Sequence, residues 1–153
     1  MLKFEDWQKS VRGDFHLEVF RHGVPIDHID DHNLVVYTGR ERLAQLLCGE
    51  STKGVTQLGV GSGAATELDT DTELTEQQLF QLTGRKSDGR DARFDFEIKE
   101  NEANGLAIRE FGLFCEDGVM FSHRLRRRKD NGLPGVIEKE DDISIKGYWI
   151  IHF

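Results

Sequence analysis

The chain has 153 residues, of which 37% are hydrophobic and 31% are charged, a composition typical of one soluble domain with a modest core. Its 28 acidic and 20 basic residues give a net charge of −8, which argues against nucleic-acid binding because phosphates would be repelled. No apolar run approaches the about 20 residues that cross a bilayer, and the N-terminus lacks the apolar segment of a signal peptide, so no membrane insertion is expected.

The first predicted element is a half-buried strand in GDFHLEVF, because apolar and polar side chains alternate from Phe15 to Val19. The turn RHGVP follows it. Residues 25–29 are expected to return as the partner strand of a β-hairpin.

A helix is predicted next, in the segment TGRERLAQLLCGE. Thr38 and Glu41 match a capping box, in which two side chains satisfy free N–H groups at the start of a helix. Gly49 supplies a stop. One face of this helix is expected to carry its apolar side chains, namely Leu43, Leu46 and Leu47.

All later elements are predicted to be strands. VTQLGV is one, residues 78–83 are a weaker one, and ARFDFEIKE alternates with Phe94, Phe96 and Ile98 inward. The segment AIREFGLFCEDGVMFSHRL holds two apolar runs joined by a tight turn at Asp117 and Gly118.

The last predicted strand is ISIKGYWIIHF, where Gly147 is expected to form a bulge or bend. One face of this strand is expected to point inward, with Ile143, Ile145, Trp149, Ile151 and Phe153. The expected class is therefore mainly β (α+β): an antiparallel β-sandwich or rolled sheet with one packed helix and an N-terminal hairpin.

The glycine-rich stretch VTQLGVGSGAATELDTDTEL suggests three uses: a phosphate cradle, a metal loop or a structural bend. A phosphate cradle needs a helix after the glycines. Here Gly61 and Gly63 lead into an acidic segment without helical periodicity or a Lys-Ser/Thr pair. A structural bend is the favoured interpretation.

Two groups of residues are weak candidates for metal binding. Alternating carboxylates at Glu67, Asp69, Asp71 and Glu73 suit calcium, but the turn glycine and terminal glutamate of a helix-loop-helix calcium site are missing. His28 and His32 lie four residues apart in a segment with no helix signal. An exposed loop and an exposed hairpin end explain the two groups, so no metal and no other cofactor is expected.

No catalytic constellation is evident, so we predict that the chain is not an enzyme. Cys48 and Cys115 form no disulfide framework and are expected to be reduced thiols outside any activating context. Solvent-facing positions are expected for His16, His22, His123 and His152. The basic cluster HRLRRRKD, residues 123–130, lacks interleaved aromatic residues and is interpreted as a solvated loop or a protein contact.

The order of several motifs resembles the N-terminal attachment domain of bacteriophage tail-fibre, or tail-collar fibre, proteins. These motifs are a TG-x-x-x-LA helix, a strand ending in VG-x-G, a Thr-x-Leu segment, a strand of the type I-x-E-x-GL[FY]-x-x-DG and a final W-x-I-x-F. The fourth matches Ile108, Glu110, Gly112, Leu113, Phe114, Asp117 and Gly118, and the last matches Trp149, Ile151 and Phe153. The resemblance covers about residues 33–153, and residues 1–32 form an N-terminal extension that contains the hairpin. The resemblance also implies that the chain turns out of the sheet at Gly59 to Gly63, at positions suited to residues with positive φ.

The resemblance implies a non-enzymatic structural protein of a phage tail or tail-like particle, made in the bacterial cytoplasm and located in the virion. Its expected partners are other tail, baseplate or fibre proteins. The alternative is a carbohydrate- or ligand-binding β-sandwich, calcium-assisted through the acidic loop. No heptad seam is present and one strand face carries Arg93, Asp95, Glu97 and Lys99, so the isolated chain is expected to self-associate weakly, with a trimer forming on the particle.

Overall fold

A computed structural model describes residues 11–127 and 135–153. The predicted mainly-β class is confirmed, because the described residues form an antiparallel sheet of nine strands together with a two-stranded sheet and one helix. The elements are β1 (Arg12–Arg21), β2 (Val24–Val35), α2 (Tyr37–Leu47), β3 (Val55–Gly61), β4 (Gln78–Gln81), β5 (Gly84–Asp88), β6 (Asp91–Ile98), β7 (Ala107–Ile108), β8 (Glu110–Cys115), β9 (Met120–Leu125), β10 (Ile137–Glu138) and β11 (Ile143–His152).

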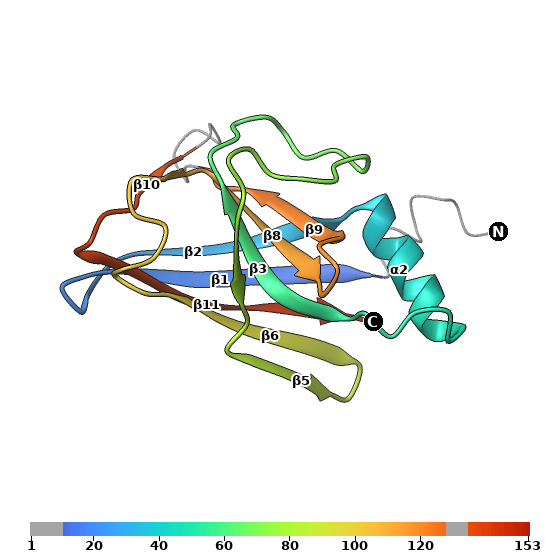
Figure 1. The fold of residues 1–153 in the computed structure, drawn as a ribbon. Coiled ribbons are helices and arrows are strands. Elements are labelled where there is room, and N and C mark those ends of the chain that lie inside the picture. Colours follow the sequence, from blue (N-terminus) through green and yellow to red (C-terminus); the bar gives the residue numbers. More distant parts are fainter. Residues whose placement is uncertain (1–10, 128–134) are drawn as a thin grey trace.

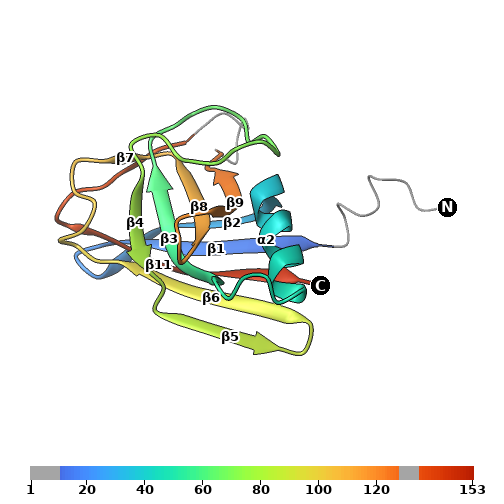
Figure 2. The same cartoon turned by 45° about the vertical axis from the view of Figure 1, so that its right-hand side comes forward.

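The nine-stranded sheet is curled into two layers. Its strand order is β4-β3-β8-β9-β2-β1-β11-β6-β5, and β7 pairs separately with β10. β3 crosses in front of β2, β1 and β11 in Figure 1, with β8 and β9 beside it, and the turned view of Figure 2 keeps the same two layers. We call β4-β3-β8-β9 the upper layer and β2-β1-β11-β6-β5 the lower layer.

The N-terminal hairpin is confirmed and lies within the lower layer. β1 pairs with β2 on one side and, from Arg12 to Arg21, with β11 on the other. The inward side chains of β1 are Phe15, Leu17 and Val19, each at most 3% exposed. The hairpin that the sequence sets apart from residues 33–153 is thus hydrogen-bonded to the last strand of the chain, whereas residues 1–10 of that extension lie outside the described part.

Aromatic side chains pack between the two layers. The ring of Phe15 lies 4.7 Å from that of Trp149 and 5.9 Å from that of Phe96, both in the lower layer. It also lies 5.0 Å from the ring of Phe111 on β8 in the upper layer. Apolar alternation on strands of both layers therefore produces one continuous core.

The helix is confirmed, but two details of its prediction are wrong. Val36 is the N-cap and no side chain caps the helix; the hydroxyl of Thr38 instead donates to the backbone carbonyl of Met120, 2.6 Å away. Leu47 is 89% exposed, and the buried positions are Gly39 and Arg42. A Cβ atom on Gly39 would lie 2.1 Å from the carbonyl oxygen of Phe121, so the helix approaches β9 through a glycine.

An ion pair fixes the helix to the β8–β9 turn. Arg42 donates to both carboxylate oxygens of Asp117, at 2.9 and 2.8 Å, and to the carbonyl oxygen of Lys53, 2.8 Å away. This bidentate contact lowers the pKa of Asp117. Gly118 has a φ of 86°, as the predicted tight turn requires.

Two predictions for the last strand are wrong. Gly147 continues the regular register opposite Leu17 and Phe96, with no bulge. A glycine is needed there because a Cβ atom would lie 2.1 Å from the carbonyl oxygen of His16. Phe153 follows the strand and is 51% exposed.

Three elements were not predicted. β5 is a charged strand at one end of the sheet, and β7 and β10 are too short to show a period. Lys139, directly after β10, is fully buried, and its Nζ donates to the carbonyl oxygens of Glu100 and Glu140 and to Oδ1 of Asn104. Within the described residues no helix is long and apolar enough to cross a membrane.

Replacing Trp149 tests the importance of the core between the layers. Trp149→Ala should lower the free energy of unfolding by about 3–5 kcal/mol, because it removes a fully buried aromatic side chain that packs against Phe15. Lys146→Ala changes an exposed residue of the same strand and should shift it by less than about 0.5 kcal/mol. Urea unfolding followed by circular dichroism measures both, and equal losses would contradict the assignment.

Candidate functional site

The acidic loop, which we define as residues 62–77, connects β3 to β4 beside the start of the helix (Figure 1). Its two ends are joined because Ser62 N–H donates to the carbonyl oxygen of Thr75, 2.9 Å away. Tyr37 N–H, at the start of the helix, donates to the carbonyl oxygen of Asp69 at 2.8 Å. The loop is therefore connected both to its own base and to α2.

Glu110, the first residue of β8, holds the base of the loop and is only 4% exposed. Its Oε2 accepts hydrogen bonds from the N–H groups of Gly63, at 2.6 Å, and Thr75, at 3.0 Å. Its Oε1 lies 2.8 Å from Nε2 of His123. Burial acts to raise the pKa of Glu110, but His123 and the two N–H groups outweigh burial and lower it. The carboxylate is thus buried in its ionised form.

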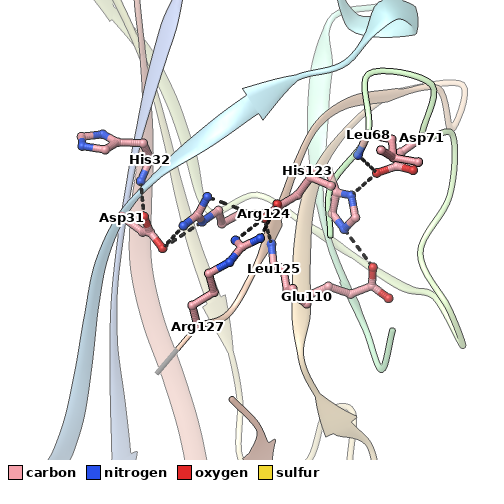
Figure 3. Close-up of polar contacts among 10 residues, drawn as sticks. Asp31, His32, Leu68, Asp71, Glu110, His123, Arg124, Leu125 and Arg127 are labelled. Atoms are coloured by element: carbon pink, nitrogen blue, oxygen red, sulfur yellow. Dashed lines mark hydrogen bonds and ion pairs between the residues drawn. The ribbon is translucent and has the colours of Figure 1, made fainter. Parts of the chain in front are cut away.

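His123 on β9 joins Glu110 to the loop, as Figure 3 shows. Its Nδ1 lies 2.7 Å from Oδ2 of Asp71, which also accepts from Leu68 N–H at 2.8 Å. Burial acts to lower the pKa of His123, but Glu110 and Asp71 together raise it. Both ring nitrogens face carboxylates, so these contacts favour the imidazolium form, which can donate from both nitrogens.

A second ionic group joins the loop to the end of β9. Both guanidinium NH groups of Arg127 donate to Glu67, at 3.0 and 2.9 Å, and Leu125 N–H donates to the same carboxylate. Arg124 lies 3.6 Å from Glu67 and also donates to Asp31 on β2 (Figure 3). Burial acts to raise the pKa of Glu67, but Arg127 and Leu125 N–H outweigh it and lower that pKa.

The glycines of this stretch serve close approach rather than positive φ, which corrects the expectation from the resemblance. None of Gly59, Gly61 and Gly63 has a positive φ. Cβ atoms on Gly61 and Gly63 would lie 2.8 and 2.3 Å from Oε2 of Glu110, and one on Gly59 would lie 2.3 Å from the ring of Phe114. The loop thus begins at a structural bend shaped around a buried carboxylate.

The weak metal candidates are not brought together. Asp71 contacts His123, Asp69 lies 3.7 Å from Arg40, and Glu73 is exposed. His28 and His32 lie on β2 in the other layer. Across residues 11–127 and 135–153, no group of three or more His, Cys, Asp or Glu side chains is arranged to hold a metal ion.

Two expectations about exposed residues are corrected. His123 was expected to face solvent, but it is 4% exposed. The basic cluster does not form a solvated loop over its described part: Arg124, Arg126 and Arg127 pair with Asp31, Asp27 and Glu67. Residues 128–130 of that cluster lie outside the described part of the chain. The partners are far apart in the sequence, so local patterns gave no signal for these contacts.

The two thiols differ in exposure. Cys48 is exposed and Cys115 is buried, and neither is in a disulfide. Burial raises the pKa of Cys115 to about 11, so its thiol stays protonated at neutral pH.

The outer face of the lower layer carries a second polar cluster. Asp14 lies between two imidazoles: its Oδ1 is 2.8 Å from Nδ1 of His32 and its Oδ2 is 2.6 Å from Nε2 of His152. Nδ1 of His152 is 2.7 Å from Oδ1 of Asp91. These side chains belong to four adjacent strands and are partly open to solvent, unlike the Glu110 group.

Comparison with known proteins gave no match. No family model, curated protein or solved structure matches this chain.

Replacing His123 tests the proton linkage of the buried group. His123→Gln should cost about 1–3 kcal/mol at mildly acidic pH, because buried carboxylates lose a donor. A raised folded-state pKa means that the contribution of His123 is fully present below the unfolded value, about 6.5, and is lost as pH rises through the folded-state value. The stability gap between wild type and variant should therefore narrow as pH rises. A gap that stays constant or widens would contradict the linkage.

Replacing Gly63 tests the close approach at the base of the loop. Gly63→Ala should cost about 1–3 kcal/mol, because its Cβ would collide with the Glu110 carboxylate. Gly54→Ala is the matched control: a Cβ there meets nothing within 4 Å and φ is not positive, so the change should be neutral or stabilising by up to about 1 kcal/mol. Thermal unfolding of the two variants measures the difference, and equal melting temperatures would refute this account.

Proposed function

We propose that the chain is a non-enzymatic structural protein of a bacteriophage tail or tail-like particle, where it docks on the tail or baseplate. The proposal starts from the resemblance of residues 33–153 to tail-fibre attachment domains. Its expected location is the virion, after synthesis in the bacterial cytoplasm.

The observation that carries the proposal is that three of the five motifs behind the resemblance meet around Glu110. Glu110 belongs to the I-x-E-x-GL motif, and it accepts a hydrogen bond from Gly63, the last glycine of the VG-x-G motif. Leu74 of the Thr-x-Leu segment packs with Phe114 in a small apolar cluster. These three motifs, which are far apart in the sequence, therefore form one structural unit.

The chemistry of the unit favours assembly over catalysis. Glu110, His123, Asp71 and Glu67 are titratable, but each contacts donors or acceptors of this same chain. Such contacts hold a loop in one position, which suits a rigid docking surface. A catalytic acid or base needs a proton position open to substrate, and Glu110 and His123 are both 4% exposed.

Fractionation of particles tests the proposal. Particles from a lysate of cells that carry the gene are separated on a density gradient, and the chain is quantified by mass spectrometry. It should co-sediment with tail proteins in a fixed ratio, and deletion of the gene should give particles that lack one or more tail components.

Complementation provides the controls. Wild type and Gly54→Ala should restore the missing components, whereas Trp149→Ala should not, because it removes core packing. Particles of unchanged composition after deletion, with the chain found only in the soluble fraction, would refute the proposal.

A further inference from the structure

The outer face of the lower layer carries an ordered array of histidines and carboxylates. Side chains that lie opposite each other on antiparallel strands share a face. Three successive outward-facing positions of β1 and β2 place an acid opposite a histidine: Asp14 opposite His32, His16 opposite Asp30 and Glu18 opposite His28. His152 on β11 lies opposite Asp91 on β6. Four of the six histidines of the chain thus lie on one face.

Contacts between neighbouring strands order these side chains. Asp14 is hydrogen-bonded to His32 and His152, and His16 to Asp30. The ring of Tyr148 on β11 stacks on His16 at 5.0 Å between centroids. On its β6 side, the guanidinium carbon of Arg93 lies 4.2 Å from the centre of the same ring. The side chains are therefore held in place before any partner arrives.

The array is negative while its histidines are neutral. On β2, β1, β11 and β6 this face presents six carboxylates, namely Asp14, Glu18, Asp30, Asp91, Asp95 and Glu97. On these strands it presents three cationic side chains, namely Arg12, Arg93 and Lys146. Lys99 and Glu100, directly after β6, line the same face beside Glu97 and Lys146, and their charges cancel. The formal charge is thus −3 with neutral imidazoles and +1 with all four protonated. The neighbouring edge strand β5 adds Lys86 and Asp88, which cancel.

The contacts of Asp14 favour its ionised form, and those of His152 favour its protonated form. Burial acts to raise the pKa of Asp14, but hydrogen bonds from His152 and His32 outweigh it and lower that pKa. Asp91 and then Asp14 raise the pKa of His152. Histidine is the side chain that ordinarily changes charge between about pH 5 and 8. Acidification within this range therefore adds positive charge to a face on which Asp14 stays ionised.

We propose that this outer face docks a basic protein surface, and that protonation of its histidines releases that partner. The inference rests on the proposed function, because an assembly protein needs a docking surface. Lysine or arginine side chains of the partner would replace imidazoles as the groups paired with Asp14 and Asp30. These two acids line an open depression of about 330 Å³ together with Tyr148. Charge complementarity excludes phosphate-rich partners, since six carboxylates would repel them.

A labelled decalysine peptide is a direct probe of the face. Fluorescence polarisation at low ionic strength and about pH 7.5 should show binding that weakens about tenfold or more by pH 5.5, as the histidines become charged. Asp14→Asn/Asp30→Asn should weaken binding about three- to thirtyfold at about pH 7.5. Glu50→Gln/Glu73→Gln removes the same charge from exposed acids outside the array and should have little effect. An equal loss in this control would reduce the effect to overall charge and overturn the proposal.

A histidine variant decides the pH dependence separately. The fourfold variant His16→Gln/His28→Gln/His32→Gln/His152→Gln keeps all six carboxylates, so it should bind the peptide at about pH 7.5. Its affinity should fall much less than that of the wild type between about pH 7.5 and 5.5. If the variant loses as much affinity as the wild type on acidification, the proposal is overturned. If a variant does not fold, imidazole NMR signals of the wild type decide instead, because peptide binding should shift those of the array and leave His123 unchanged.

A second copy of the chain is the competing occupant of the face. Two faces of charge −3 repel each other, so we expect no dimer through this face. Sedimentation velocity at about pH 7.5 without peptide tests this expectation: a dimer through this face would form in the wild type and be lost in Asp14→Asn/Asp30→Asn. Such a dimer would overturn the assignment to a basic partner. The peptide assay measures binding to the outer face of the isolated chain, whereas particle fractionation measures association with the tail. Either experiment can therefore fail without the other.

Discussion

The two halves of the sheet are held together by side-chain packing more than by the backbone ladder. Among the described residues β2 and β9 are paired through two positions, Leu34 opposite His123 and Val35 opposite Ser122. Phe15 supplies the stronger connection, because its ring contacts Trp149 in its own layer and Phe111 in the other. Burial of one large apolar side chain contributes about 1.5–3 kcal/mol, and this cluster holds several such side chains.

The buried carboxylate of Glu110 is a polar group that the apolar core must accommodate. Burial of a carboxylate is unfavourable unless hydrogen bonds and a counter-charge compensate for lost hydration. Two loop N–H groups and the imidazolium of His123 provide both. This compensation requires the loop backbone to come very close, which explains the lack of a Cβ at Gly63. The glycines are therefore required by the buried glutamate. Two acids of the loop, Asp71 and Glu67, have partners of their own in His123, Arg124 and Arg127.

The spacing of apolar residues along the sequence predicted most strands and the helix, but few contacts of the candidate site. Period-two alternation found the inward residues of β1, β6 and β11 because each strand faces one core, and Asp117-Gly118 identified its turn by local chemistry. Arg42, His123 and Lys139 were not predicted to be buried, since each has partners far away in the sequence. The same separation hid the array on the outer face, whose members lie on strands from both ends of the chain. Alternation shows which side of a strand is polar, but the register between strands decides which polar residues meet.

The separation of two kinds of histidine explains how a pH-dependent face is compatible with a stable fold. His123 lies inside and its charge is linked to loop position, whereas the array lies on the opposite side of strands whose other side forms the core. Exposed ion pairs contribute about 0–1 kcal/mol each, which is small beside the about 5–15 kcal/mol of a typical domain. Protonation of the array therefore changes the surface charge by up to four units while core packing around Phe15 and Trp149 stays intact. A docking surface can respond to acidity in this way only because strand alternation isolates it from the interior.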